Sequence, residues 1–244
     1  MVDLGIKVAN VASDGCVVHR GKVVVIDGDL GGANLHNFLC VSRPQTSLTD
    51  FFERKVPLAE LVVGSGTENL GLISGMLGTT GAESIKHVQK KKFFNHISKL
   101  DTDYIMIDLG AGTSFNTIDT LLLADQMIVV VIPEIPSIVN MYNCLRNLFV
   151  SKIGTVLNDY GYRELIVSTW KRRQDLGIVN FKQLVDYLKN TSPELRQIVE
   201  QELSSFTVNI VLNQVRTNKD IMIGNSVKSV CRTFFGTHAL HSGY

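Results

Sequence analysis

The sequence has no closely spaced pair of cysteines. Its four cysteines, Cys16, Cys40, Cys144 and Cys231, lie far apart. A zinc knuckle or a thiol redox motif needs two cysteines a few residues apart, so neither kind of site is expected. The spacing favours reduced, mostly buried thiols.

An excess of charge of one sign and a long apolar run are also missing. The formal net charge is +1 for 244 residues, which gives no general reason to expect nucleic acid or an anionic membrane as the main partner. The most apolar run, Met127–Pro133, is too short to cross a bilayer, and the start of the sequence lacks the basic and apolar regions of a secretory signal. We therefore expect a cytoplasmic protein without a transmembrane segment.

Short apolar runs rich in β-branched residues alternate with segments that carry apolar residues at helical spacing. The runs are almost continuously hydrophobic, which is typical of strands buried on both faces. We expect strands at Val23–Ile26, Leu70–Ile73, Tyr104–Ile107, Ile128–Ile132 and Val208–Leu212. We expect helices at Leu48–Val63, Ser84–Leu100, Asn116–Ala124 and Ser137–Phe149. This alternation predicts an α/β fold with a mostly parallel sheet and helices on both faces.

One region breaks the alternation. Between Ser151 and Phe206 the chain is charged and helix-prone, with no strand pattern. We expect a helical insertion over 151–206, between the strands at Ile128 and Val208, with its apolar residues packed on one face. No repeat, low-complexity tract or linker divides the chain, so a single domain over 1–244 is predicted.

The first candidate site follows the strand at Val23–Ile26. Ligands of open parallel sheets bind beyond the carboxyl ends of the strands. Here Asp27 and Asp29 lie two residues apart, so an extended backbone would point both carboxylates to the same side. Such a pair could hold a hydrated magnesium ion or orient an attacking water. The alternative is an ordinary Asp-Gly turn with an aspartate that caps the next helix.

A second candidate carboxylate ends the strand at Tyr104–Ile107. Four apolar residues followed by Asp108 form a Walker B pattern, in which the carboxylate meets magnesium through water. Gly110 and Gly112 then form a loop near the expected position of the terminal phosphate.

Two further strand ends carry candidate nucleotide contacts. The strand at Ile128–Ile132 runs into Pro133 and Glu134, and the strand at Val208–Leu212 ends at Asn213. The side-chain amide of Asn213 could read an adenine edge, because an amide both donates and accepts hydrogen bonds. Alternatively, Asn213 only satisfies backbone groups of its loop.

The block VVVIDGDLGGANLH at positions 23–36 resembles the second conserved block of MinD/ParA-type P-loop ATPases (SIMIBI class), above all the MinD-like regulators of flagellar number. The likeness continues through YIMIDLGAGTSFNTIDTLLLAD, VVVIPEIPSIVNMYNCLR and VLNQVRTNKDIMIGNSVKSVCRTFFG. It extends from about Ala9 to the end of the chain and includes the segment KRRQDLGI of the expected insertion. The resemblance implies a three-layer, Rossmann-like P-loop NTPase fold that binds ATP and Mg²⁺.

The family's residue roles map onto this chain position by position. Asp27 corresponds to the switch carboxylate near the attacking water, and Asp29 to its neighbour. Asp108 corresponds to the carboxylate that holds the metal, while Gly110 and Gly112 match the second switch.

The adenine side of the family's site maps onto the last two strand ends. Asn213 corresponds to the adenine contact, and Pro133 and Glu134 to the loop that borders the same pocket.

The sequence departs from the family at its amino end. Family members open with a strand and a KGGxGKS/T loop that holds the phosphates and magnesium. An ungapped register places Leu4 at the lysine position and Gly5 at the Ser/Thr position. A gap brings Lys7 to the lysine position but puts Val8 in place of the hydroxyl. We therefore expect an absent or degenerate Walker A loop and a chain incomplete at both ends relative to the family.

The resemblance implies an ATP-dependent switch that regulates flagellar number or placement. It also implies a homodimer around bound ATP and a flagellar assembly protein as partner. ATP hydrolysis does not follow from the resemblance, because the lysine that stabilises the transferring phosphoryl group in the family is missing here. One alternative is a non-catalytic interaction protein that keeps the fold and uses the helical insertion. Another is a ParA-like DNA-segregation factor, against which the near-neutral charge argues.

Overall fold

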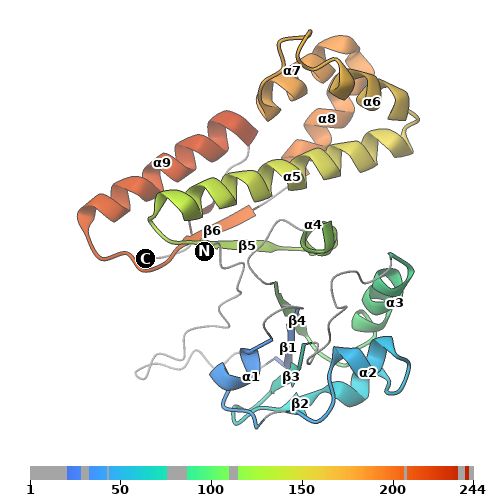
Figure 1. The fold of residues 1–244 in the computed structure, drawn as a ribbon, viewed down its shortest axis with the longest axis vertical. Helices are drawn as coiled ribbons and strands as arrows, with labels where there is room; N and C mark the ends of the chain where they lie inside the picture. The colour runs from blue at the N-terminus through green and yellow to red at the C-terminus, as the bar shows by residue number, and fades with distance from the viewer. Residues whose placement is uncertain are drawn as a thin grey trace. The chain divides into compact units, whose positions relative to one another are not determined.

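The computed structural model describes residues 21–28, 33–42, 44–75, 87–109, 115–205, 208–235 and 240–241. The chain divides into two compact units, one of residues 3–111 and one of residues 112–244 with residues 1–2. Each unit is an α/β structure whose strands pair mostly in parallel, as predicted (Figure 1). A single domain across the whole chain stays a prediction.

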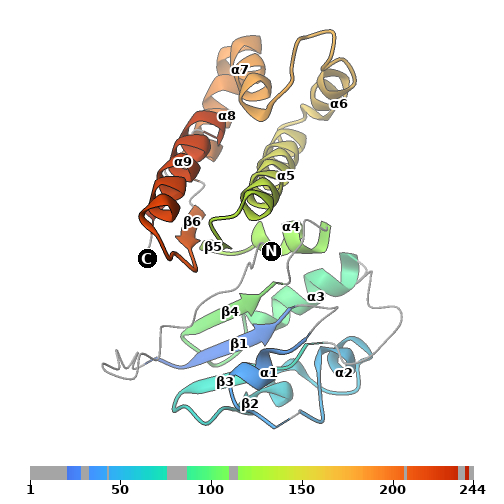
Figure 2. The ribbon, with the colours of Figure 1, turned by 60° about the vertical axis from the view of Figure 1, so that its left-hand side comes forward.

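The first unit contains a four-stranded sheet in the order β2-β3-β1-β4. Its strand β1 pairs in parallel with β3 on one side and β4 on the other, whereas β2 is antiparallel to β3 (Figure 2). The strands span Val23–Asp27 for β1, Val63–Gly64 for β2, Leu70–Ile73 for β3 and Tyr104–Asp108 for β4. The three strands predicted for this part of the sequence are therefore confirmed.

Helices of the first unit are short. They span Leu35–Phe38 for α1, Leu48–Phe52 for α2, Leu58–Leu61 for the 3-10 helix η1 and His87–Ile97 for α3. The single helix predicted over Leu48–Val63 is wrong, because the chain leaves α2 through Arg54 at a φ of 62° and then meets Pro57. A left-handed residue and a proline both interrupt α-helical hydrogen bonding.

One face of this sheet packs against α2, η1 and α3. Buried side chains from β1 and β3 meet those of the helices there, and three of the phenylalanine rings, Phe51, Phe52 and Phe93, lie 5.3–6.0 Å apart between centroids. The buried members of this core are Val24, Ile26, Leu48, Phe51, Leu58, Leu61, Ile73, Phe93 and Ile97. Val24 and Ile26 belong to this face, so the alternation of side chains along a strand assigns Val25 and Asp27 to the other face.

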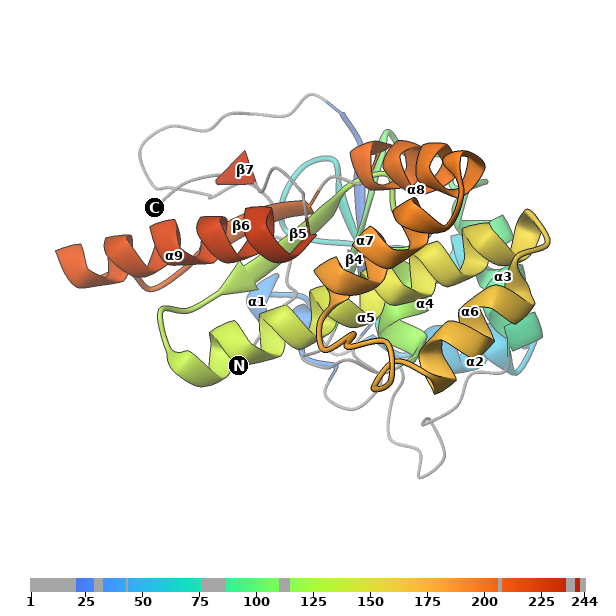
Figure 3. The same cartoon turned by 90° about the horizontal axis from the view of Figure 1, so that it is seen from above.

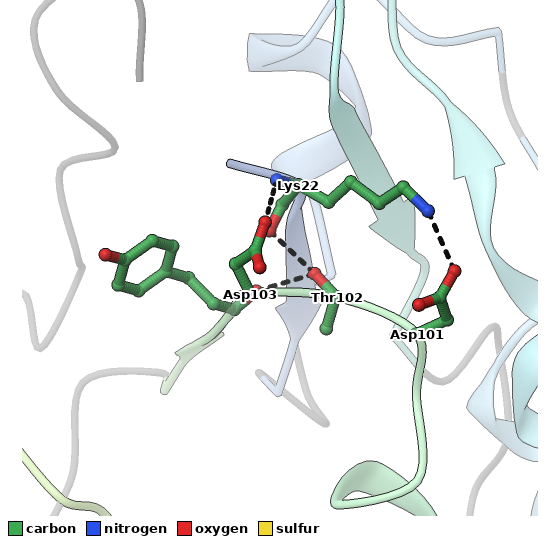
Figure 4. Close-up of polar contacts among 5 residues, drawn as sticks. Lys22, Asp101, Thr102 and Asp103 are labelled. Atoms are coloured by element: carbon green, nitrogen blue, oxygen red, sulfur yellow. Dashed lines mark hydrogen bonds and ion pairs between the residues drawn. The ribbon is translucent and has the colours of Figure 1, made fainter. Parts of the chain in front are cut away.

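The amino ends of β1 and β4 are held by a polar network (Figure 4). The Lys22 backbone N–H donates to the Asp103 carboxylate at 2.7 Å, and the Thr102 hydroxyl donates to the Lys22 carbonyl at 2.8 Å. The Lys22 ammonium pairs with Asp101 at 2.8 Å, and this hydrogen bond holds the pKa of the Asp101 carboxyl below its ordinary value. These contacts help fix the register of the two strands.

The second unit contains a three-stranded parallel sheet in the order β5-β6-β7. Its strands span Met127–Val131, Val208–Leu212 and Leu240–His241. The helices span Phe115–Leu121 for α4, Ile135–Asp159 for α5, Arg163–Lys171 for α6, Phe181–Thr191 for α7, Pro193–Ser205 for α8 and Asn218–Phe235 for α9. The predicted strands are again confirmed to within one residue.

Helices alone occupy residues 151–205, where no strand pattern was found in the sequence. The predicted helix at Ser137–Phe149 is the first part of α5, which continues to Asp159 and is followed by α6, α7 and α8 (Figure 3). Phe149 of α5 is buried and lies 5.4 Å from the ring of Phe181 on α7. None of the helices within the described ranges is long and apolar enough to cross a membrane.

The side chain of Phe149 is a test of this packing. Phe149→Ala leaves a cavity beside Phe181, so we expect the free energy of unfolding to fall by about 3–5 kcal/mol. Urea denaturation followed by circular dichroism measures the change. Val179→Ala removes a side chain that is 83% exposed and is the matched control. Equal stability of the two variants would contradict the packing.

The three described cysteines are free thiols, of which Cys40 is exposed and Cys144 and Cys231 are buried. Burial raises the pKa of both buried thiols to about 11, whereas the thiolate is the form that reacts with alkylating agents. At pH 8 we expect iodoacetamide to modify Cys40 rapidly and the buried pair only after denaturation. Peptide mass spectrometry reads out each position, and rapid labelling of Cys144 in the native protein would refute the assignment.

Candidate functional site

Two of the predicted carboxylates lie side by side at the carboxyl edge of the first sheet. The parallel pairing of β1 with β4 continues to its last residues, where Asp27 is the register partner of Asp108. Neighbouring strands are about 4.8 Å apart and paired residues project from the same face. Both carboxylates therefore belong to the face opposite the core that packs on α2 and α3.

Asp27 is almost completely enclosed, with 2% of its surface exposed. Its carboxylate accepts a hydrogen bond of 3.0 Å from the backbone N–H of Leu35, the first residue of α1. Burying a carboxylate is costly unless it is hydrogen-bonded, and this contact offsets part of that cost. The alternative role, an aspartate that caps the next helix, thus also has a contact in the structure.

Glycines allow the chain to pass close to these carboxylates. The Gly28 N–H donates to the Asp108 carbonyl at 2.7 Å, and a Cβ at Gly28 would lie only 2.7 Å from that oxygen. A Cβ at Gly75 would lie 2.8 Å from the Asp27 carbonyl and 2.8 Å from the Cβ of Ala33. Only glycine fits these two positions without a shift of the backbone.

Sequence reasoning missed Ser74 and Gly75, which follow β3. Ile26 pairs with Ile73, so extending the register by one residue places Ser74 beside Asp27. Ser74 is 1% exposed, and its carbonyl accepts a 3.0 Å hydrogen bond from the Leu48 N–H. The rule that identified Asp27 and Asp108, a polar residue directly after a buried strand, would also have identified Ser74.

The donor set at this edge fits a magnesium-bound phosphate group. Magnesium is commonly held by one or two carboxylates and keeps several of its waters, and Asp27 and Asp108 supply that number. Across the described ranges, no group of three or more His, Cys, Asp or Glu side chains is placed to hold a metal ion. The Ser74 hydroxyl, which has no hydrogen-bond partner among the described residues, could bind an oxygen of such a group.

The other candidate contacts lie in the second unit. Parallel pairing of β5 with β6 brings Pro133 and Glu134 near Asn213, whose N–H donates to the Val131 carbonyl at 2.7 Å. The Asn213 side-chain oxygen accepts from the Gln214 N–H at 2.9 Å. This contact is the alternative considered from the sequence, in which the Asn213 side chain hydrogen-bonds a backbone group of its own loop. Adenine binding by Asn213 stays a prediction.

Asp29, Gly110 and Gly112 lie outside the described residues. The same holds for the amino-terminal segment that aligns with the family's phosphate loop, including Leu4 and Lys7. The roles expected for them stay predictions.

The fit around Gly75 gives a direct test of the site's geometry. Gly75→Ala pushes a methyl group against the Asp27 carbonyl, and overpacking of this kind destabilises by about 1–3 kcal/mol. Gly66→Ala is the control, because a Cβ there meets nothing within 4 Å. Urea denaturation of both variants measures the difference, and a Gly75→Ala protein as stable as the control would show that the edge is loosely packed.

No family model matches the sequence. The septum site-determining protein MinD of Helicobacter pylori (strain ATCC 700392 / 26695) is 30% identical over 119 residues, which are 48% of this chain and 44% of that protein. The chain therefore spans less than half the length of this relative.

Solved structures extend the likeness over more of the chain. Apo McdA from Cyanthece matches with a TM-score of 0.52 and 17% identity, over 88% of this chain and 72% of that one. MinD in the MinC:MinD cell division complex of Aquifex aeolicus matches with a TM-score of 0.50 and 17% identity, over 90% and 67%. Identities this low concern the fold alone. The chain has the α/β fold found in MinD/ParA-type P-loop ATPases.

Proposed function

We propose that this chain is a nucleotide-binding switch protein of the MinD/ParA type that takes Mg²⁺ and ATP at the carboxyl edge of β1 and β4. The observation that carries the proposal is the in-register pair of Asp27, which is 2% exposed, and Asp108. Two glycines, Gly28 and Gly75, pack closely against the backbone of these two residues. A buried carboxylate next to a second one is unfavourable unless a cation or hydrogen bonds compensate. The Leu35 N–H already compensates Asp27 in part, and a magnesium ion beside the two carboxylates would further favour their charged forms.

Each carboxylate has a distinct role in the proposal. Asp108 holds the ion through water, as the Walker B resemblance implies, and Asp27 orients a water at the phosphate end. Asp29 and Gly110 contribute to the phosphate side, as the resemblance implies. We propose ATP binding without efficient hydrolysis, because no register of residues 4–8 supplies both the lysine and the hydroxyl of the family's phosphate loop.

The biological setting follows from the resemblance alone. We propose a cytoplasmic homodimer that forms around ATP and acts on a flagellar assembly protein to set flagellar number or placement. The MinC:MinD cell division protein complex contains another protein of this fold bound to a protein partner, which supports a partner-binding switch rather than a metabolic enzyme.

A second candidate function is a non-catalytic interaction protein. The observation that favours it is the exposure of large apolar side chains along the helical region. Tyr160 is 59% exposed, Val167 and Trp170 are each 47% exposed, and Val179 is 83% exposed. Exposed apolar groups that gather in one region mark protein interaction sites. In this case the partner would bind whether or not ATP is present.

Magnesium-ATP binding is tested by thermal shift together with phosphate release. A ligand that binds only the folded state raises the melting temperature, with a stabilisation of about 2.7 kcal/mol at one hundred times its Kd. We expect a shift for the wild type with little phosphate release, and a reduced shift for Asp27→Asn and Asp108→Asn.

Asp125→Asn is the matched control for these variants. It removes an exposed carboxylate just before the amino end of β5, so its ATP-dependent shift should equal that of the wild type. Absence of any shift at millimolar Mg²⁺-ATP would refute the switch proposal and favour the interaction protein.

A further inference from the structure

Three buried side-chain polar atoms lack a hydrogen-bond partner in the described part of the chain. They are Nδ1 of His36, Oγ1 of Thr49 and Oγ of Ser74. Ser74 directly follows β3, and the other two residues are next in sequence to residues that contact this edge of the first sheet. His36 follows Leu35, whose N–H donates to Asp27, and Thr49 follows Leu48, whose N–H donates to the Ser74 carbonyl.

The Ser74 hydroxyl is the most enclosed of these groups, since only 1% of the residue is exposed. A buried donor or acceptor that makes no hydrogen bond destabilises a protein. Ser47 in the same unit is the matched comparison, because it is 2% exposed and its hydroxyl is hydrogen-bonded. Its hydroxyl caps α2 by accepting from the Thr49 N–H at 3.2 Å and lies 3.4 Å from the Asp50 carboxylate.

The position of Ser74 indicates what its hydroxyl could bind. It directly follows β3, and extending the register of β1 with β3 by one residue places it beside Asp27, which pairs with Asp108. Oxygen-bearing side chains therefore lie at the ends of β1 and β4 and just after the end of β3. By strand alternation the Ser74 side chain is on the same face of the sheet as the two carboxylates. Gly75 then keeps the chain against Asp27, where an added Cβ would lie 3.2 Å from Oδ1 of that carboxylate.

We infer that Ser74 is a binding residue for the magnesium-nucleotide, whose hydroxyl hydrogen-bonds an oxygen of the ligand, either on the phosphate or on a water of the metal ion. This inference rests on the proposed function. A serine hydroxyl both donates and accepts, so it suits either oxygen. The unsatisfied hydroxyl lowers the stability of the free protein, and its hydrogen bond forms only when the ligand is present.

The test compares Ser74→Ala with Ser47→Ala and wild type in the full chain. Thermal melting is recorded without ligand and in titrations of Mg²⁺ alone, Mg²⁺-ADP and Mg²⁺-ATP. We expect Ser74→Ala to melt at or above the wild-type temperature without ligand, because it removes a group that has no partner. Its Kd for Mg²⁺-ATP should rise roughly tenfold, the loss of one hydrogen bond to a charged group.

Ser47→Ala should behave in the opposite way. Loss of its helix cap lowers the melting temperature without ligand by roughly 2–4 °C, while the Kd stays at the wild-type value. A weakened response to Mg²⁺ alone would assign the hydroxyl to the metal's water shell. A weakened response only to the two nucleotides would assign it to the phosphate. Both results support the inference.

Three results would overturn it. If Ser74→Ala binds Mg²⁺-ATP as tightly as the wild type while Asp108→Asn binds weakly, Ser74 is not a binding residue and the proposed function stands. If the wild type shows no response to Mg²⁺-ATP at all, both the inference and the proposed function fail. A fall in the ligand-free melting temperature of Ser74→Ala equal to that of Ser47→Ala would also count against the inference, because it would mean that the hydroxyl is already hydrogen-bonded.

Discussion

The in-register parallel pairing of β1 with its two neighbours is the constraint on which the candidate site depends. Side chains that are distant in sequence become neighbours only because Val23–Asp27 pairs residue by residue with Tyr104–Asp108. A shift of one residue would turn Asp108 to the opposite face of the sheet. The polar network around Lys22 helps hold this register at the amino end, and the close contact of Gly28 with Asp108 holds it at the other end.

The two faces of the first sheet differ in chemistry. One face packs on α2, η1 and α3 through a continuous apolar core, and this burial supplies stability. The carboxyl end of the other face has the buried, hydrogen-bonded carboxylate of Asp27 and the hydroxyl of Ser74. This hydroxyl has no hydrogen-bond partner among the described residues, which lowers the stability of the free protein. Polar groups that a fold retains at such a cost are typical of binding sites, where a ligand completes their contacts.

The strands could be predicted from the sequence, because nearly continuous runs of β-branched residues are typical of strands buried on both faces of a sheet. The pairing of Asp27 with Asp108 followed from the rule that parallel strands end at one edge. Other features depend on local detail. The pattern of apolar residues from Leu48 onward suits a helix, but the left-handed turn at Arg54 and the proline at Pro57 end it early. Ser74 also directly follows a predicted strand, but a serine there is less distinctive than an aspartate, and its burial beside Asp27 is what singles it out.

The most direct test of a metal-nucleotide site at this edge is a crystal structure of the chain with Mn²⁺ and a non-hydrolysable ATP analogue. Anomalous scattering from manganese locates the ion independently of the protein atoms. The account predicts a manganese peak within water-mediated reach of both Asp27 and Asp108. A peak bound elsewhere, with these two carboxylates contacting only protein groups, would contradict it.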